Sequence, residues 1–166
     1  IRDVYGDGHV WVLLDGSIVS LGVDFHGNVI AEPVSEQLKF PSGIYVTDFV
    51  TKGGEVWIST DAGVCRYNRG EDIIKVYMHD DNDPNSLSQN FVTSLAITSD
   101  KRLLVGTLRG LNVYNPIRDN FMRIGAGGSD SGTDRLNNNF VNCILVDGER
   151  IWVGTEGGGV NKFTRN

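Results

Sequence analysis

The segment LLVGTLRGLNVYN, from Leu103 to Asn115, decides the fold because two near copies of it occur in the same chain. Each copy has an apolar run, a Thr, a short turn containing Gly, and a second apolar run that closes on an aromatic residue. Self-similarity at a fixed spacing is the signature of a repeat architecture. The other copies are VWISTDAGVCRYN, from Val56 to Asn68, and IWVGTEGGGVNKF, from Ile151 to Phe163.

The spacing of the copies defines a period of about 46 to 49 residues. The central Thr residues recur 47 and 48 residues apart, and a degenerate first copy places Trp11 46 residues before Trp57. A second block precedes each clear copy: YVTDFV from Tyr45, FVTSLAI from Phe91 and FVNCILV from Phe140. The recurring Thr residues are Thr60, Thr107 and Thr155.

Each repeat is interpreted as four short strands. In the third repeat the runs VTSLAIT, RLLVGTL, GLNVYNP and NFMRIG are separated by Ser-Asp, Arg-Gly and Arg-Asp turn signals. Their β-branched and aromatic residues favour strands. Leu87, Phe91 and Leu95 stand at helical spacing, so a helix is the alternative there. The pairs Val92-Thr93 and Ile97-Thr98 favour the strand.

Four antiparallel strands in about 47 residues predict an all-β fold built from β-propeller blades. The repeats begin near residues 1, 46, 92 and 141, giving segments 1–45, 46–91, 92–140 and 141–166 of a single partial propeller domain, 1–166. This amounts to about fifteen strands, or three and three-quarter blades. Because a propeller removes its strand edges by closure, the chain is either a four-bladed ring or a fragment of a larger ring. We favour the fragment.

At these residues the sequence resembles the two-component regulator propeller repeat. The hallmarks of that repeat are a W-I-G-T-x-x-G-L-x-x-Y-D/N block and a loop like N-D-P-x-S-L-S-x-N-x-V. The first corresponds to the three copies above, and the second to NDPNSLSQNFV from Asn82 to Val92, with a worn copy, RLNNNFV, from Arg135 to Val141. The resemblance is clear over residues 45–166 and weak over 1–44. Leu103-Leu104 and Ser59 depart from the pattern.

The resemblance implies a seven-bladed propeller in the periplasmic half of a hybrid two-component sensor of Bacteroides-like bacteria. Members of that family sense oligosaccharides and control genes for polysaccharide use. The family's kinase, transmembrane helix and DNA-binding domain are absent from these 166 residues. The resemblance therefore predicts an extracytoplasmic segment that binds or docks without signalling by itself.

The composition excludes several partners. Fifteen Lys and Arg stand against 21 Asp and Glu, a formal net charge of −6, so nucleic acid is not expected as the main partner. The longest apolar run, Val10 to Leu14, is far shorter than the roughly 20 residues of a membrane helix. The two cysteines, Cys65 and Cys143, are expected to be buried free thiols.

No cofactor, metal or catalytic constellation is expected. Asp81, Asp83 and Asn85 alternate as in the start of a calcium loop, but Ser86 and Val92 stand where that loop needs Gly and Glu. The histidines, His9, His26 and His79, fall at non-equivalent positions of different repeats. We expect a binding segment rather than an enzyme.

A binding surface follows from the alternation of strand direction. The turn after the second strand and the connection after the fourth strand lie at the same end of a blade. Charged, amide and aromatic groups gathered there suit a sugar, whose hydroxyls need planar polar partners and whose ring faces stack on aromatic rings. The predicted ligand-binding residues are Asp61, Arg109 and Glu156 from the turns, and Tyr45, Asn90, Phe91, Asn138, Asn139 and Phe140 from the connections.

Three functions remain open from the sequence. The first is a sensor segment that binds an oligosaccharide or packs against neighbouring blades and domains of a parent chain. The second is a scaffold propeller for protein docking, and the third is a piece of a propeller lyase or glycosidase. Unpaired edges of an open ring also predict self-association.

Overall fold

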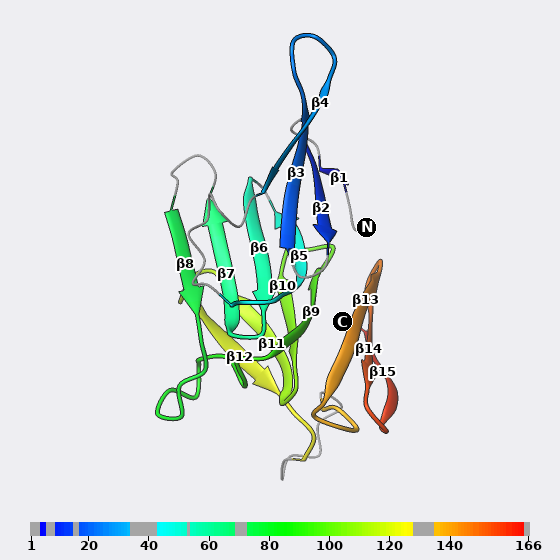
Figure 1. The fold of residues 1–166 in the computed structure, drawn as a ribbon. Helices are drawn as coiled ribbons and strands as arrows, with labels where there is room; N and C mark the ends of the chain where they lie inside the picture. The colour runs from blue at the N-terminus through cyan, green and yellow to red at the C-terminus, as the bar shows by residue number, and fades with distance from the viewer. Residues whose placement is uncertain are drawn as a thin grey trace.

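The computed structural model describes residues 4–5, 9–14, 17–33, 43–52, 54–68, 73–127 and 135–164. These residues form four antiparallel sheets, A to D, in chain order, and contain no helix (Figure 1). Consequently none of the described segments is a helix that could span a membrane. The all-β fold predicted from the repeat is confirmed, and the alternative helix at Leu87–Leu95 is wrong because Val92–Ile97 is a strand.

Each sheet is a meander in which neighbouring strands follow one another in the chain. Sheet A contains β1 (Val4–Tyr5), β2 (His9–Leu14), β3 (Ser17–Val23) and β4 (Val29–Pro33). Sheet B contains β5 (Val46–Lys52), β6 (Glu55–Thr60), β7 (Gly63–Asn68) and β8 (Ile73–Tyr77). Sheet C contains β9 (Val92–Ile97), β10 (Leu103–Thr107), β11 (Gly110–Asn115) and β12 (Asn120–Ile124). Sheet D contains β13 (Val141–Asp147), β14 (Arg150–Thr155) and β15 (Gly159–Thr164).

The first strands of sheets B, C and D lie side by side, β5 beside β9 and β9 beside β13. Side-chain hydrogen bonds repeat along this row. Thr47 Oγ1 donates to Val92 O at 2.7 Å, and Thr93 Oγ1 donates to Val141 O at the same distance. One Thr side chain on β5 and one on β9 thus hold each first strand, which we call the inner strand, against the inner strand of the next sheet. Inner strands are arranged in this way around a propeller axis.

In the described part of the chain, the core consists of three clusters, one between each pair of consecutive sheets. The cluster between sheets B and C surrounds Trp57, which is fully buried. Because strand residues alternate between faces, one face of sheets B and C packs on the preceding sheet and the other on the following one. Truncating Trp57 to Ala would cost about 3–5 kcal/mol through lost burial and the cavity left behind.

A polar cluster also joins sheets B and C. The Asp119 carboxylate accepts hydrogen bonds from Tyr77 Oη at 2.6 Å and Tyr114 Oη at 2.5 Å, and it pairs with Lys75. Burial alone would raise the pKa of Asp119, but hydrogen bonds from Lys75, Tyr114 and Tyr77 lower it to about 2. Burial raises the pKa of Tyr77, and its bond to Asp119 raises it further.

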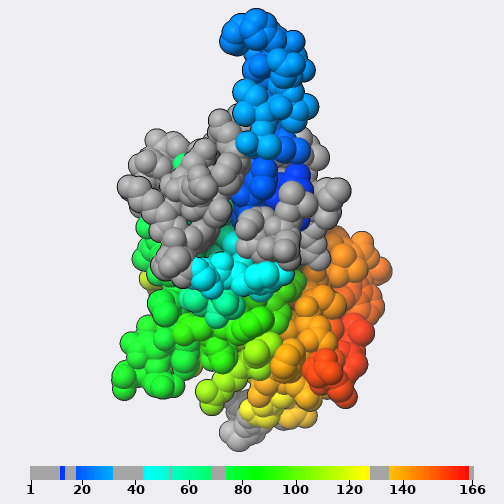
Figure 2. All heavy atoms as spheres, in the orientation of Figure 1, coloured from blue at the N-terminus to red at the C-terminus, as the bar shows by residue number. Residues whose placement is uncertain are grey.

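The β3–β4 hairpin protrudes from the rest of the molecule (Figure 2). Its turn is closed by Asp24, whose Oδ1 accepts hydrogen bonds from the backbone N–H groups of His26 and Asn28. Gly27 at the tip has a φ of 83°, a conformation that glycine adopts without steric cost. Phe25 at this tip is 92% exposed, so the tip lies outside the core, whereas Ile18 at the base of the hairpin is buried in it.

Candidate functional site

The two groups of predicted site residues meet at one end of the sheets, which we call the loop end. In sheets B, C and D, a backbone N–H of the turn after the second strand donates to the carbonyl of the residue just before the first strand. These bonds are 2.9–3.3 Å long. The geometric basis of the prediction therefore holds. The bonded pairs are Asp61 with Tyr45, Leu108 with Phe91, and Glu156 with Phe140.

Three aromatic rings mark this end. Tyr45, Phe91 and Phe140 each precede an inner strand and are 51%, 39% and 38% exposed. Because the inner strands lie side by side, the rings follow one another along the row β5, β9 and β13. Half-exposed aromatic faces can stack on the apolar faces of sugar rings.

The predicted Asn residues have structural partners. Asn90 Oδ1 accepts a hydrogen bond from His79 N at 2.6 Å, and Asn138 Oδ1 accepts one from Phe140 N at 2.8 Å. Asn139 Oδ1 accepts one from Ala126 N at 2.5 Å. The side-chain oxygens of these three Asn residues therefore stabilise the backbone of the segments before β9 and β13.

The carboxylates of the predicted set are also engaged. Asp61 Oδ1 accepts a hydrogen bond from Tyr45 N at 3.0 Å, and Glu156 Oε2 accepts one from Asn142 Nδ2 at 2.9 Å. Asp61 belongs to the sheet B turn and Glu156 to the sheet D turn, with sheet C between them. The two groups therefore do not form a carboxylate pair.

The connection before β9 is held in place by one buried apolar side chain and by a set of buried hydrogen bonds. Leu87 is fully buried, and the next residue, Ser88, donates its backbone N–H to Asn112 Oδ1 at 2.9 Å. Ser88 Oγ also lies 2.8 Å from Thr107 Oγ1. All these polar atoms are buried, so each depends on its partner. These hydrogen bonds of Ser88 hold the residues before β9 against the β10–β11 turn.

The worn copy of the motif repeats this arrangement before β13. Leu136 is 2% exposed, and Asn137 N donates to Asn161 Oδ1 at 2.8 Å. Asn161 corresponds to Asn112 one repeat earlier. The Leu and the residue after it therefore recur in the motif because they anchor each connection to the third strand of its own sheet.

A polar cavity of about 310 Å³ opens at the loop end. Arg109 is the predicted site residue that contributes to it. Sequence reasoning missed Arg123, whose guanidinium binds the connection before β9 through Ser86 O at 2.9 Å, Asp83 O at 2.9 Å and Leu87 O at 3.0 Å. The lining residues are His79, Asp81, Ser88, Arg109, Arg123, Ile124 and Gly125.

The histidine in this cavity contacts three neighbours. His79 Nδ1 lies 2.6 Å from Leu87 O and 3.3 Å from Arg123 Nη2. Its Nε2 lies 3.0 Å from Asp81 Oδ1. The other acidic residues of the loop, Asp80 and Asp83, accept backbone N–H bonds within their own turns. Across the described residues, no three metal-ligating side chains come together.

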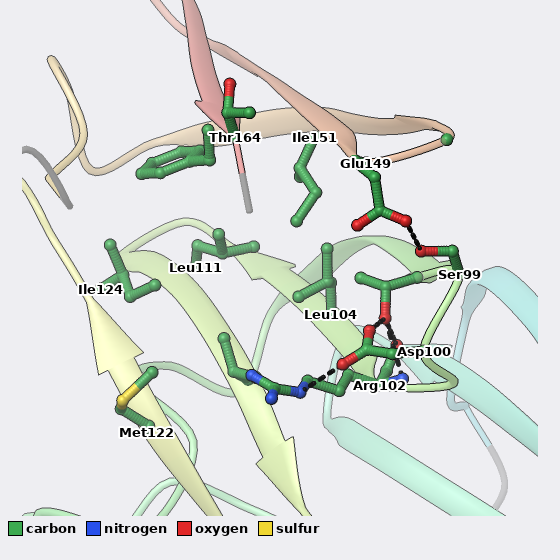
Figure 3. Close-up of a pocket in the computed structure, with 14 residues that line it drawn as sticks. Ser99, Asp100, Arg102, Leu104, Leu111, Met122, Ile124, Glu149, Ile151 and Thr164 are labelled. Carbon is green, nitrogen blue, oxygen red and sulfur yellow. Dashed lines mark hydrogen bonds and ion pairs between the residues drawn. The ribbon is translucent and has the colours of Figure 1, made fainter. Parts of the chain in front are cut away.

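A second cavity, of about 220 Å³, lies between sheets C and D at the opposite end (Figure 3). Its floor is apolar, with Leu104, Leu111 and Ile151 pointing into it. At its rim Ser99 Oγ donates to Glu149 Oε1 at 3.0 Å. It is a gap in blade packing, and it brings together none of the predicted site residues. The other lining residues are Thr98, Asp100, Arg102, Val113, Met122, Ile124, Gly148, Phe163 and Thr164.

The cysteine prediction holds for one residue only. Cys65 is buried in the core between sheets A and B, and burial raises the pKa of its thiol to about 12. Cys143 is exposed, contrary to the expectation. It lies on β13, whose outward face packs on no described sheet.

Comparisons with known proteins agree with this architecture. Residues 135–157 match the family described as two component regulator propeller. An extracellular domain of a candidate hybrid two-component system from Bacteroides thetaiotaomicron superposes with a TM-score of 0.70 at 20% identity, covering 95% of this chain and 22% of that one. A second such domain from this species gives 0.71 at 24% identity, covering 98% and 20%.

The fold also occurs in an enzyme. Virginiamycin B lyase from Staphylococcus aureus gives a TM-score of 0.57 at 14% identity, covering 98% of this chain and 54% of the lyase. No curated protein is similar enough to count as a relative. The chain spans about a fifth of the length of the two Bacteroides domains. The resemblance to two-component regulator propeller repeats is confirmed, and the solved structures confirm the propeller-type fold.

Proposed function

We propose that this chain is a segment of the extracytoplasmic, periplasmic sensor domain of a hybrid two-component system, and that its loop end binds a carbohydrate-like ligand. The observation that carries the proposal is the gathering of aromatic, amide and charged groups at that end. The match at residues 135–157 and the two Bacteroides extracellular domains support the sensor assignment. They also support an extracytoplasmic location.

We further propose that the segment belongs to a larger propeller, in which another blade packs on the outward face of sheet D. Trp57 and Leu104, at equivalent positions of sheets B and C, are 0% and 3% exposed because the next sheet covers them. On sheet D the outward face carries Leu145 and Val160, which are 62% and 65% exposed. An apolar sheet face of this kind is normally covered.

The cavity of Figure 3 supports the same proposal. Between sheets B and C, Phe121 of the fourth strand β12 fills the cluster beside Tyr114, its cross-strand partner. Phe163 is the residue of β15 equivalent to Tyr114, and sheet D has three described strands. A fourth strand pairing with β15 would place a side chain opposite Phe163, in this cavity.

A protein-docking scaffold is the second candidate, and the exposed outward face of sheet D is the observation that favours it. A lyase or glycosidase function has weaker support. A glycosidase needs two carboxylates about 5 to 9.5 Å apart across the scissile bond. Asp61 and Glu156 stand on turns of non-neighbouring sheets and each already accepts a hydrogen bond.

A glycan-array screen of the chain tests ligand binding. The variant Phe91→Ala removes a half-exposed ring at the loop end, and Ile117→Ala, at a 94% exposed position on the β11–β12 turn, is the matched control. We expect saturable binding of one oligosaccharide class, weakened by Phe91→Ala and unchanged in Ile117→Ala. Absence of binding across the array would contradict the proposal of a carbohydrate ligand and would favour the protein-docking scaffold.

A further inference from the structure

We propose that the polar cavity at the loop end binds the carboxylate of an acidic sugar, a uronic acid unit of an oligosaccharide. The proposal rests on the proposed function, because it names the chemical class of ligand at the same end of the sheets. It is carried by two guanidinium groups that line one cavity without an acidic partner among the described residues.

Arg109 supplies the first of these groups. It is exposed on the β10–β11 turn, and its guanidinium makes no hydrogen bond or ion pair with a described residue. Its backbone is nonetheless fixed, since Arg109 N donates to Thr107 Oγ1 at 3.1 Å. The neighbouring Leu108 N donates to Phe91 O, which brings a half-exposed aromatic ring to the same turn.

Arg123 supplies the second group in a fixed orientation. Its Nε and Nη2 atoms bind carbonyl oxygens and the Ser86 hydroxyl, at 2.7 Å, and Nη2 also lies 3.3 Å from His79 Nδ1. Its Nη1 group bonds to no described residue, so two N–H donors remain. A guanidinium that is held in place loses little freedom when a ligand arrives, and this favours binding.

Among the described residues, fewer acidic than basic side chains line the cavity. Asp81 is the cavity's one acidic lining residue, is 90% exposed, and contacts His79 Nε2. Asp80 and Asp83 cap backbone N–H groups of their own turns and do not line the cavity. Two guanidinium groups against one carboxylate give the described lining a net positive charge, in a chain whose formal net charge is −6.

Carboxylate is the anion that this arrangement suits best within a sugar ligand. The planar fork of arginine matches a carboxylate in two parallel hydrogen bonds. A sugar also offers hydroxyls to Asp81, and an oligosaccharide that extends past the β10–β11 turn offers a ring face to Phe91 outside the cavity, whereas a free anion does neither. A cavity of about 310 Å³ is of the size that holds a small polar ligand.

The test is calorimetric titration of the whole 166-residue chain at low ionic strength with trigalacturonate and, as a neutral probe, its methyl ester. Arg109→Gln removes one guanidinium, and Arg118→Gln, an exposed position on the β11–β12 turn, is the matched control. We expect the acid to bind at least tenfold more tightly than the ester, with this preference lost in Arg109→Gln and kept in Arg118→Gln.

Three results would overturn the proposal: equal affinity for acid and ester, a preference that survives in Arg109→Gln, or no binding of the acid. Displacement of trigalacturonate by an equal concentration of inorganic sulfate would also overturn it, because the cavity would then be a general anion site. Neutral glycans binding on the array alongside equal affinity for acid and ester would leave the proposed function standing while this inference fails.

Discussion

Asp119 holds two sheets together through one carboxylate, and its backbone takes a φ of 54°, unusual for a residue with a side chain. Its partners come from sheet B (Lys75 and Tyr77) and sheet C (Tyr114). Since the folded-state pKa of about 2 lies below the ordinary value of 3.8, the contribution of Asp119 to stability is present above about pH 4. It is lost as the pH falls towards 2.

The substitution Asp119→Asn should therefore lower Tm by about 2–4 °C near neutral pH, the effect of roughly 1 kcal/mol in a chain of this size. Asn tolerates the left-handed backbone, so the change isolates the charge. Thermal unfolding followed by circular dichroism from pH 2 to pH 7 measures it. The two Tm curves should converge near pH 2, and a constant offset at all pH values would contradict the assignment.

Thr107 illustrates the recurring Thr of the repeat. Its buried hydroxyl donates to Gly110 O at 3.0 Å, accepts from Arg109 N, and contacts Ser88 Oγ. Thr107→Val keeps the shape but leaves these groups unpaired, so we expect a loss of about 1–3 kcal/mol in urea unfolding. The control Thr164→Val, at an exposed position, should change stability by less than about 0.5 kcal/mol. Equal effects of the two changes would contradict a structural role for Thr107.

At the scale of elements, the β10–β11 hairpin depends on its glycine. Gly110 has a φ of 127°, and a Cβ there would lie 2.8 Å from Ile124 O. Gly110→Ala should cost about 2 kcal/mol or more, from the unfavourable backbone conformation and the clash. Gly148→Asn is the control, because φ is 59° and nothing lies within 4 Å of the added Cβ. Chemical denaturation of both variants tests this, and a neutral Gly110→Ala would show that the hairpin relaxes.

The strands were predictable from sequence because alternation and turn residues are local signals. The recurrence of Thr60, Thr107 and Thr155 located the second strand of sheets B, C and D correctly. Arg123 could not be found in this way, since its role depends on a connection that folds back over β12. The exposure of Cys143 could not be predicted from the sequence either, because it depends on whether another sheet covers β13 and not on the strand itself.

The predicted ligand-binding residues show the same division between local and non-local signals. Their gathering at one end followed from strand direction, which depends only on the order of strands. Which of them are free to contact a ligand depends on local hydrogen bonds that the sequence does not display. Asn90 and Asn139 proved to hold backbone N–H groups, whereas Arg109 makes no side-chain bond to a described residue.

At the scale of the whole molecule, the exposed apolar face of sheet D makes self-association the expected behaviour of the chain in solution. Light scattering should show a mass that rises with concentration. Leu145→Lys, at a 62% exposed position, should shift the chain towards monomer, and Ile117→Lys, at a 94% exposed turn position, should leave its association unchanged. A monomer at high concentration would instead favour a closed four-bladed ring.

Each of sheets A to C packs on the next sheet through one recurring face, and no described residue covers this face of sheet D. Hydrogen exchange of the 166-residue chain, at a concentration where it is monomeric, tests this most directly. We predict that the amides of β5 and β9 exchange slowest, and that those of β13 exchange at least about tenfold faster because one face of their sheet is open to water. Amides of β13 as protected as those of β9 in the monomer would show instead that the outward face of sheet D is covered.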